Sequence, residues 1–191
     1  MFKQKANAYL TGATLALGLT LSSQVLVDID ADDAAKLNAE ARATLNKFVA
    51  DTKGASAVLA NAKGVLVCPT IRKGGLGFGA EHGKCVLTSG AAQPLYYGTT
   101  GIKGGLIAGY ESHSMILALN TNEALAKFTS GTHEWELGVD ASVAVAKIGA
   151  GGDIDTTNLK KDIVSFIFGS KGLIADLTWE GSRFKRLEIE K

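Results

Sequence analysis

The sequence predicts a β-rich α+β fold, in which a curved antiparallel sheet or a barrel-like sheet carries amino-terminal helices packed on it. Three observations lead to this prediction. Apolar residues recur at helical spacing near the amino terminus, but beyond Gly64 the period changes mainly to two. Of the 23 glycines, twelve lie between Gly64 and Gly109, where they separate short apolar runs. The runs follow one another too closely to be joined by crossover helices, so their strands are expected to pair mainly antiparallel.

The amino terminus has the pattern of an export signal. Lys3 and Lys5 precede an uncharged stretch over residues 6–27, whose most apolar part reads ATLALGLTL. A positive start followed by an apolar segment is typical of a secretory signal peptide, although this stretch is also long enough to cross a bilayer uncleaved. We therefore assign residues 1–23 to a signal peptide or an uncleaved anchor, and residues 24–191 to a single domain.

Three helices are expected after this segment. Four aspartates followed by apolar residues at helical spacing predict a helix over residues 31–51, and a second, short helix is predicted over 55–62. A third helix is predicted over 122–128, with Asn120 as its cap and Glu123 three residues further on.

The remainder is expected to be mostly strands. Residues 135–145 alternate apolar with polar or small side chains, as do residues 173–179, whereas residues 163–168 are more uniformly apolar and are expected to be buried on both faces. Further strands are predicted near 65–69, 76–80, 84–88, 94–98, 103–109, 114–119 and 183–189, mostly separated by short turns that contain glycine.

Composition and motifs argue against several classes of function. Twenty basic and nineteen acidic residues give a net charge of +1, so nucleic acid is not an expected partner. The glycine pattern over residues 75–80 loosely matches a dinucleotide loop, but another strand-like run follows it where that motif requires a helix. His82, His113 and His133 lie far apart, without the spacing of a zinc site. We therefore expect no catalytic residues, no metal and no cofactor, and a protein that is not an enzyme.

The two cysteines form a candidate pair. If the strands around residues 65–69 and 84–88 form a hairpin, its centre falls inside the glycine-rich stretch, and Cys68 faces Cys85. A disulfide between them is one hypothesis, and two separate buried thiols are the other.

Several ordered motifs resemble one known family. The segment AKGVLVCP over residues 62–69, followed by IRKGGLGFG over 71–79, resembles the signature of the SYLF domain family. Residues 104–109, 115–128 and 138–144 resemble its later strands and its short helix, so that the resemblance covers roughly residues 35–189.

The resemblance implies a β-rich fold with amino-terminal helices that binds membrane lipids, with phosphoinositides favoured by the eukaryotic members. Those members also act on actin, but a protein that leaves the cytoplasm does not meet actin. The chain looks like the stand-alone bacterial members, which are envelope proteins. We therefore expect a periplasmic, membrane-associated or secreted protein whose partners are anionic membrane lipids.

Local basic clusters at predicted strand ends and turns are the candidate headgroup site, because cations near an anionic surface bind it. Only Lys73 among them belongs to the matched family motif. The candidates are Arg72, Lys73, Lys160, Lys161, Lys171, Arg183 and Lys185. The alternative interpretation is a structural or protein-interaction module of the bacterial envelope with no specific lipid ligand, in which these charges only aid solubility.

Overall fold

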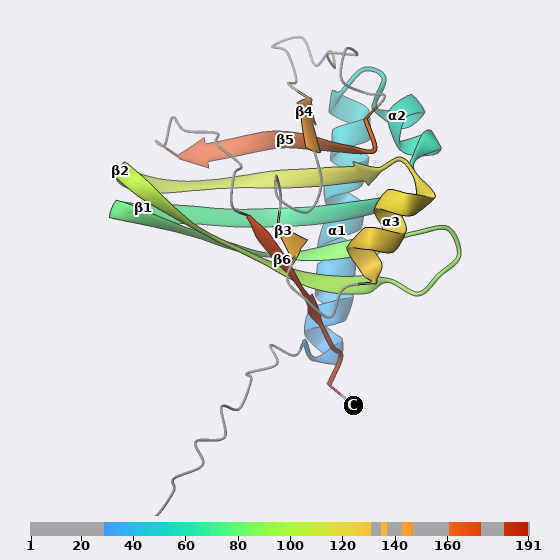
Figure 1. Ribbon diagram of the computed structural model, residues 1–191, viewed down its shortest axis with the longest axis horizontal. Helices are drawn as coiled ribbons and strands as arrows, with labels where there is room; N and C mark the ends of the chain where they lie inside the picture. Colours follow the sequence, from blue (N-terminus) through green and yellow to red (C-terminus); the bar gives the residue numbers. More distant parts are fainter. Residues whose placement is uncertain (1–28, 131–134, 137–142, 147–160, 173–181, 191) are drawn as a thin grey trace, which may run out of the picture.

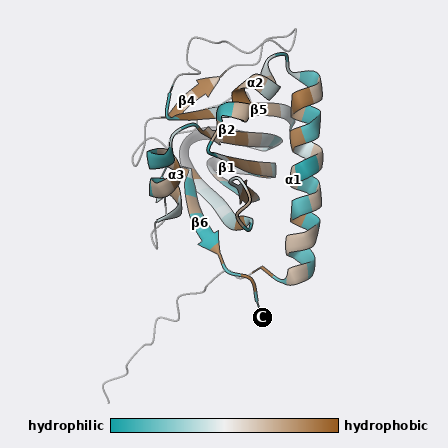
Figure 2. Ribbon diagram, turned by 90° about the vertical axis from the view of Figure 1, so that its right-hand side faces the viewer, coloured by the Kyte–Doolittle hydropathy of each residue, from teal (hydrophilic) through white to brown (hydrophobic). Residues whose placement is uncertain are grey.

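The computed structural model describes residues 29–130, 135–136, 143–146, 161–172 and 182–190 (Figure 1). A curved sheet lies at its centre, the long helix α1 runs across one face, and α3 lies near the other (Figures 1 and 2). This arrangement confirms the predicted fold class. The elements in chain order are α1 (Ala31–Asp51), α2 (Ala55–Asn61), β1 (Gly64–Thr88), β2 (Leu95–Leu119), α3 (Asn122–Thr129), β3 (Trp135–Glu136), β4 (Val143–Ala146), β5 (Ile163–Gly172) and β6 (Arg183–Leu187).

Helix α1 has the bounds that its sequence predicts. The Asp30 carboxylate accepts a hydrogen bond from the backbone N–H of Asp33 at 2.7 Å and so caps the first turn. Residues at helical spacing form its buried stripe: Ala34, Leu37, Ala41 and Phe48. This stripe packs against the sheet, and Phe48 contacts Phe166 and Phe168 of β5 at ring-centroid distances of 5.2 and 5.1 Å.

The glycine-rich stretch forms two long strands where the sequence predicts six short ones. β1 and β2 pair antiparallel along almost their whole length, from Leu87 opposite Leu95 to Gly64 opposite Leu119. The pairing continues through the glycines, as where Gly75 lies opposite Gly109. Turns at these glycines were therefore a wrong prediction. Backbone N–H and C=O groups form the ladder whether or not a side chain is present, so glycine bends a strand without ending it.

The β1–β2 ribbon folds back on itself. Figure 1 shows both strands doubling back at the end that lies away from α2 and α3. The two halves of β1 consequently lie side by side: the Cα atoms of Cys68 and Cys85 are 4.1 Å apart, and the Thr88 hydroxyl donates to the carbonyl of Val65 at 3.4 Å. At Gly83 a Cβ atom would come within 2.9 Å of the Thr70 carbonyl oxygen, so this close approach requires glycine.

The other strands extend the sheet at both ends of the folded ribbon. β5 pairs antiparallel with the second half of β2, and β6 pairs antiparallel with its first half. β3 adds to β6, and β4 lies parallel to β5. The sheet is therefore largely antiparallel as predicted, with the β4–β5 pair as a parallel exception.

Two hydrophobic cores lie on opposite faces of this sheet. The outer core, between the sheet and α1, includes Val67, Val86 and Ile116. The inner core, in the concave side, includes Leu66, Cys68, Cys85 and Met115 together with Phe128 of α3. Since successive side chains of a strand point to opposite faces, each long strand contributes to both cores.

Details of the predicted elements around α3 differ from the structure. Thr121, not Asn120, caps α3 by accepting a hydrogen bond from the N–H of Ala124 at 3.1 Å. The Asn120 amide instead donates to the Lys161 carbonyl at 2.8 Å, tying the end of β2 to the start of β5. Of the predicted strand over 135–145, only β3 and the start of β4 lie within the described residues. The predicted strand at 173–179 lies outside them, as does the amino-terminal segment of residues 1–28.

Among the helices that the structure describes, none has the length and apolarity to span a bilayer.

Candidate ligand-binding groove

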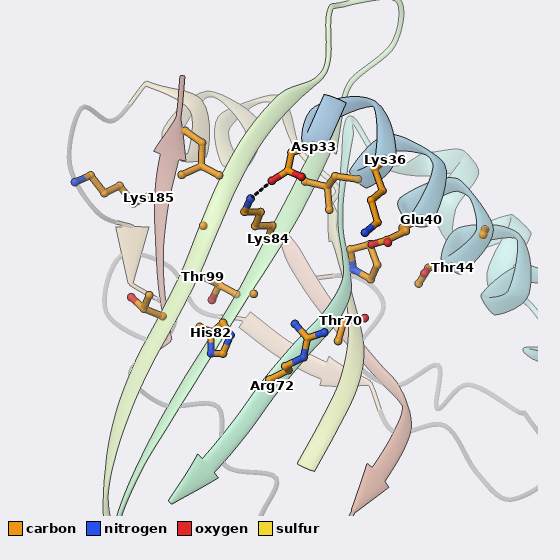
Figure 3. A pocket seen from close by; sticks show the side chains of 17 residues that line it. Asp33, Lys36, Glu40, Thr44, Thr70, Arg72, His82, Lys84, Thr99 and Lys185 are labelled. Carbon is orange, nitrogen blue, oxygen red and sulfur yellow. Dashed lines mark hydrogen bonds and ion pairs between the residues drawn. The ribbon is translucent and has the colours of Figure 1, made fainter. Parts of the chain in front are cut away.

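A groove of about 900 Å³ lies between α1 and the outer face of the sheet (Figure 3). Its helical wall carries Lys36, Glu40 and Thr44, and side chains of β1, β2 and β6 line the sheet side. The residues that line it are Asp33, Lys36, Leu37, Glu40, Ala43, Thr44, Pro69, Thr70, Arg72, His82, Gly83, Lys84, Gly98, Thr99, Thr100, Lys185 and Leu187.

The periodicities of helix and strand explain how these distant residues meet. Asp33, Lys36, Glu40 and Thr44 are three or four residues apart and therefore form one stripe on α1. On the sheet, Arg72 and the alternate residues His82 and Lys84 point outward toward this stripe. Figure 3 shows the Arg72 guanidinium and the His82 ring in the space below the helix.

Positive charge predominates in the groove. Four cationic side chains, those of Lys36, Arg72, Lys84 and Lys185, line it with two acidic ones, those of Asp33 and Glu40. Lys84 donates to the Asp33 carboxylate at 2.8 Å, and this hydrogen bond and the lysine charge lower the pKa of Asp33 below its ordinary 3.8. The leucine side chains of Leu37 and Leu187 add apolar surface at the same site. The groove therefore suits a ligand with an anionic group next to an apolar part.

A smaller pocket of about 230 Å³ adjoins the groove, because Thr44, Pro69 and Thr70 line both. Lys171 of β5 and Lys47 of α1 line this second pocket, and Lys47 forms an ion pair with Asp51 one turn further along the helix. The pocket extends the positively charged region along α1.

The structure separates the candidate headgroup cations of the sequence. Arg72 and Lys185 line the groove, and Lys171 lines the adjoining pocket. Arg183 is exposed and pairs with Glu136 at 3.2 Å. Lys161 is exposed but does not line the groove, and Lys160 lies outside the described residues.

Among the candidate headgroup cations, Lys73 has the position that differs most from the sequence prediction. It lies within β1 with only 4% of its surface exposed, on the inner face of the sheet, whereas the sequence placed it with the rim cations at a strand end. The physical reason is the strand period of two, which turns Lys73 away from the face that its neighbour Arg72 occupies.

Sequence reasoning missed Lys36, Lys84 and His82 as groove residues. None of them belongs to a local basic cluster, so composition alone gave no signal. The stripe of Asp33, Lys36 and Glu40 on the predicted helix was the available clue, because residues three or four apart lie on one face of a helix.

A second group of polar side chains is buried on the inner face, close to the bend of the ribbon. Glu111 lies opposite Lys73 in the β1–β2 register, and the His113 Nδ1 lies 3.7 Å from a Glu111 carboxylate oxygen. Ser182 donates a short hydrogen bond to the Glu81 carboxylate. Lys73, Glu81, Glu111, His113 and Ser182 are each at most 5% exposed. We call these five residues the inner polar cluster.

Cys68 and Cys85 are joined by a disulfide in the structure, with the two sulfurs 1.99 Å apart. The bond lies in the inner core and connects the two halves of β1. The sequence left open a disulfide or two separate buried thiols, and the structure contains the disulfide.

In the part of the chain that the structure describes, no group of three or more histidine, cysteine, aspartate or glutamate side chains is arranged to hold a metal ion.

One protein-family model matches the second half of the domain. Residues 100–188 match the family model Ysc84, described as "Las17-binding protein actin regulator". Over these residues the chain is similar to the Ysc84, or SYLF, domain family. The match begins within β2 and includes α3, β5 and β6, so the resemblance stated from the sequence is confirmed. Most residues of the groove, including Arg72 and the stripe on α1, precede the part of the chain that matches the Ysc84 model.

No curated protein sequence matches the chain.

Proposed function

We propose that this SYLF-domain protein is an exported, non-enzymatic lipid-binding protein that holds an anionic headgroup in the groove between α1 and the sheet. The observation that carries the proposal is the groove itself, which four cationic and two acidic side chains line together with apolar surface.

The chemistry of the cations fits a phosphate-bearing headgroup. The planar guanidinium of Arg72 presents paired N–H donors that match two phosphate oxygens, and lysine adds positive charge over a flexible reach. Each basic residue near an anionic membrane surface contributes about 1 kcal/mol of attraction. Leu37 and Leu187 provide the apolar contacts that the adjoining glycerol or acyl region requires.

The amino-terminal pattern supports the choice of a lipid over actin. The matched family is described as an actin regulator, and the sequence resemblance implies lipid binding as well. Residues 1–23 have the pattern of an export signal, and outside the cytoplasm a protein meets lipid surfaces but not actin. The proposed locations are the periplasm, the envelope membranes or the exterior.

Co-sedimentation with vesicles of phosphatidylglycerol and phosphatidylcholine tests the groove. The variant Arg72→Glu/Lys185→Glu reverses two groove charges, and Lys127→Glu/Lys161→Glu makes the same charge change at exposed residues that do not line it. We expect the groove variant to bind at least about tenfold more weakly at low salt, while the control stays within about twofold of the wild type.

The measurement is made on the full chain and on a chain without residues 1–23, because an apolar amino-terminal segment itself associates with vesicles. Equal binding by the two double variants would contradict a headgroup site in the groove. Absence of vesicle binding by both wild-type chains would favour the protein-interaction module, for which the Las17-binding description of the matched family is the supporting observation.

A further inference from the structure

Three large apolar side chains protrude where the β1–β2 ribbon doubles back. Leu76 is 87% exposed, Ile102 is 84% exposed and Tyr110 is 56% exposed. We call these three residues the apolar tip. Other exposed large apolar side chains of the described residues are only 36–47% exposed and belong to α1, β4 and the carboxy-terminal end. The tip is thus a distinct concentration of exposed apolar surface.

Strand alternation places the tip on the outer face, the same face as the groove. Leu76 lies four residues from the groove residue Arg72, and Ile102 lies two residues from the groove residue Thr100. Tyr110 lies opposite Gly74, which is two residues from both Arg72 and Leu76. The three side chains therefore point to one side of the ribbon.

A row of cations lies next to the tip on this face. Arg72, Ser112 and Lys171 lie side by side across β1, β2 and β5. Tyr110 is two residues beyond Ser112, a distance of roughly 7 Å along an antiparallel strand. Among the described residues no acidic side chain forms an ion pair with Arg72 or Lys171.

We propose that the apolar tip is a membrane-docking surface that inserts into the outer layer of an anionic bilayer while Arg72 and Lys171 contact lipid phosphates. The choice of a bilayer as occupant rests on the proposed function. Leucine and isoleucine enter the acyl boundary, tyrosine stays at the interface with its hydroxyl in water, and the cations meet the headgroup layer behind them.

Charge and area both favour a bilayer over a second protein. The cations beside the tip match the negative charge of anionic lipids. A stable protein interface buries about 800 Å² on each partner, far more than three side chains on a narrow ribbon provide. Insertion of a few apolar side chains, assisted by basic residues, is by contrast sufficient for reversible attachment to a membrane.

Vesicle binding by the full chain tests the tip with changes that leave every charge in place. Leu76→Ser/Ile102→Ser removes most of the tip, and Val49→Ser/Ile189→Ser removes two exposed apolar side chains elsewhere. We expect the tip variant to bind anionic vesicles about tenfold more weakly and the control to bind like the wild type. Both tip side chains are largely in solvent, so the variant is expected to keep the thermal unfolding midpoint of the wild type.

Insertion is measured directly with a tryptophan reporter. In Leu76→Trp the new indole is expected to be quenched by lipids brominated along their acyl chains, whereas in Ile189→Trp the quenching is expected to match that of the wild type. This measurement reports the position of the tip even if residues 1–23 hold the whole chain on the vesicle. If the new indole of vesicle-bound Leu76→Trp stays unquenched, the proposal is overturned.

The two proposals fail separately. If charge reversal in the groove weakens binding and the tip variant binds normally, the tip proposal is wrong and the headgroup site stands. If only the tip variant binds weakly, the headgroup site is wrong and so is the contact of Arg72 with lipid phosphates, whereas insertion of the apolar tip stands. A wild-type dimer in light scattering that the tip variant abolishes, together with unchanged vesicle binding, would identify the tip as a contact between copies and overturn membrane docking.

Discussion

The inner and outer faces of the curved sheet receive residues from the same strands and use charge in opposite ways. Arg72 points into an open groove on the outer face, and its neighbour Lys73 lies buried on the inner face across from Glu111. A cation in the groove is available to a ligand, whereas Lys73 is enclosed by the fold. The comparison shows that two adjacent basic residues of one motif need not share a role.

The largest expected effect comes from removing the buried cation. Lys73→Met leaves the Glu111 carboxylate, which lies opposite it in the β1–β2 register, buried without that charge, and this is expected to cost about 4 kcal/mol of unfolding free energy. Arg72→Met is the matched control and is expected to change the unfolding free energy by less than about 0.5 kcal/mol. Urea unfolding measures both, and equal effects of the two substitutions would refute the assignment of the residues to opposite faces.

The disulfide is the next largest contribution on the inner face. Cys68 and Cys85 are separated by 17 residues, and a cross-link that closes a loop of this size stabilises by about 3 kcal/mol. We expect Cys68→Ala/Cys85→Ala to unfold at lower urea concentration by this amount. Intact mass of the native protein before and after reduction checks the bond itself, and two free thiols in the native protein would contradict it.

A smaller effect tests the contact between the two halves of β1. Gly83→Ala would place a Cβ atom 2.9 Å from the Thr70 carbonyl oxygen, and the displacement needed is expected to cost about 2 kcal/mol. At Gly74 on the same strand a Cβ atom would meet its nearest neighbours at 3.5 and 3.6 Å, an ordinary contact distance. Gly74→Ala is therefore the control, and a thermal shift as large as that of Gly83→Ala would argue against a folded-back ribbon.

The smallest effect concerns the exposed ion pair of the outer face. Lys84→Gln removes the hydrogen bond and the charge that lower the pKa of Asp33, so this pKa is expected to rise toward its ordinary 3.8. In the wild type, the contribution of the pair to stability is present above that ordinary value and is lost as the pH falls through the lowered pKa. An NMR titration of the Asp33 carboxyl carbon in both proteins measures the change, and the same pKa in both would show that the pair does not form in solution.

Local patterns predicted the helices and the fold class well. The aspartates before residue 31 and the apolar spacing after it gave the bounds of α1, because capping and helical periodicity act within a few residues. The cap of α3 was displaced by one residue, since Asn120 and Thr121 are both suitable caps and the pairing with Lys161 decides between them.

The length of the strands and the site were harder to predict. Glycines within residues 74–80 have the composition of turns, yet partners in β2 hold them in a ladder, and those partners are distant in sequence. The candidate set included Arg72 and Lys185 but not Lys36 or Lys84, because the groove exists only once α1 crosses the sheet. The alternation of side chains along a strand places Lys73 and Arg72 on opposite faces, but the sequence prediction grouped them because they are adjacent cations.

The ribbon also sets the order in which the chain can assemble. Leu87 and Leu95 meet across a short turn, whereas Gly64 must find Leu119 at the far end of the same ladder. Closing the short loop first costs the least chain entropy, so we expect pairing to spread outward from the turn. If the chain emerges from a translocation channel amino terminus first, the first half of β1 leaves before its partner and carries an unpaired edge. This edge is the segment that we expect a holding chaperone to recognise.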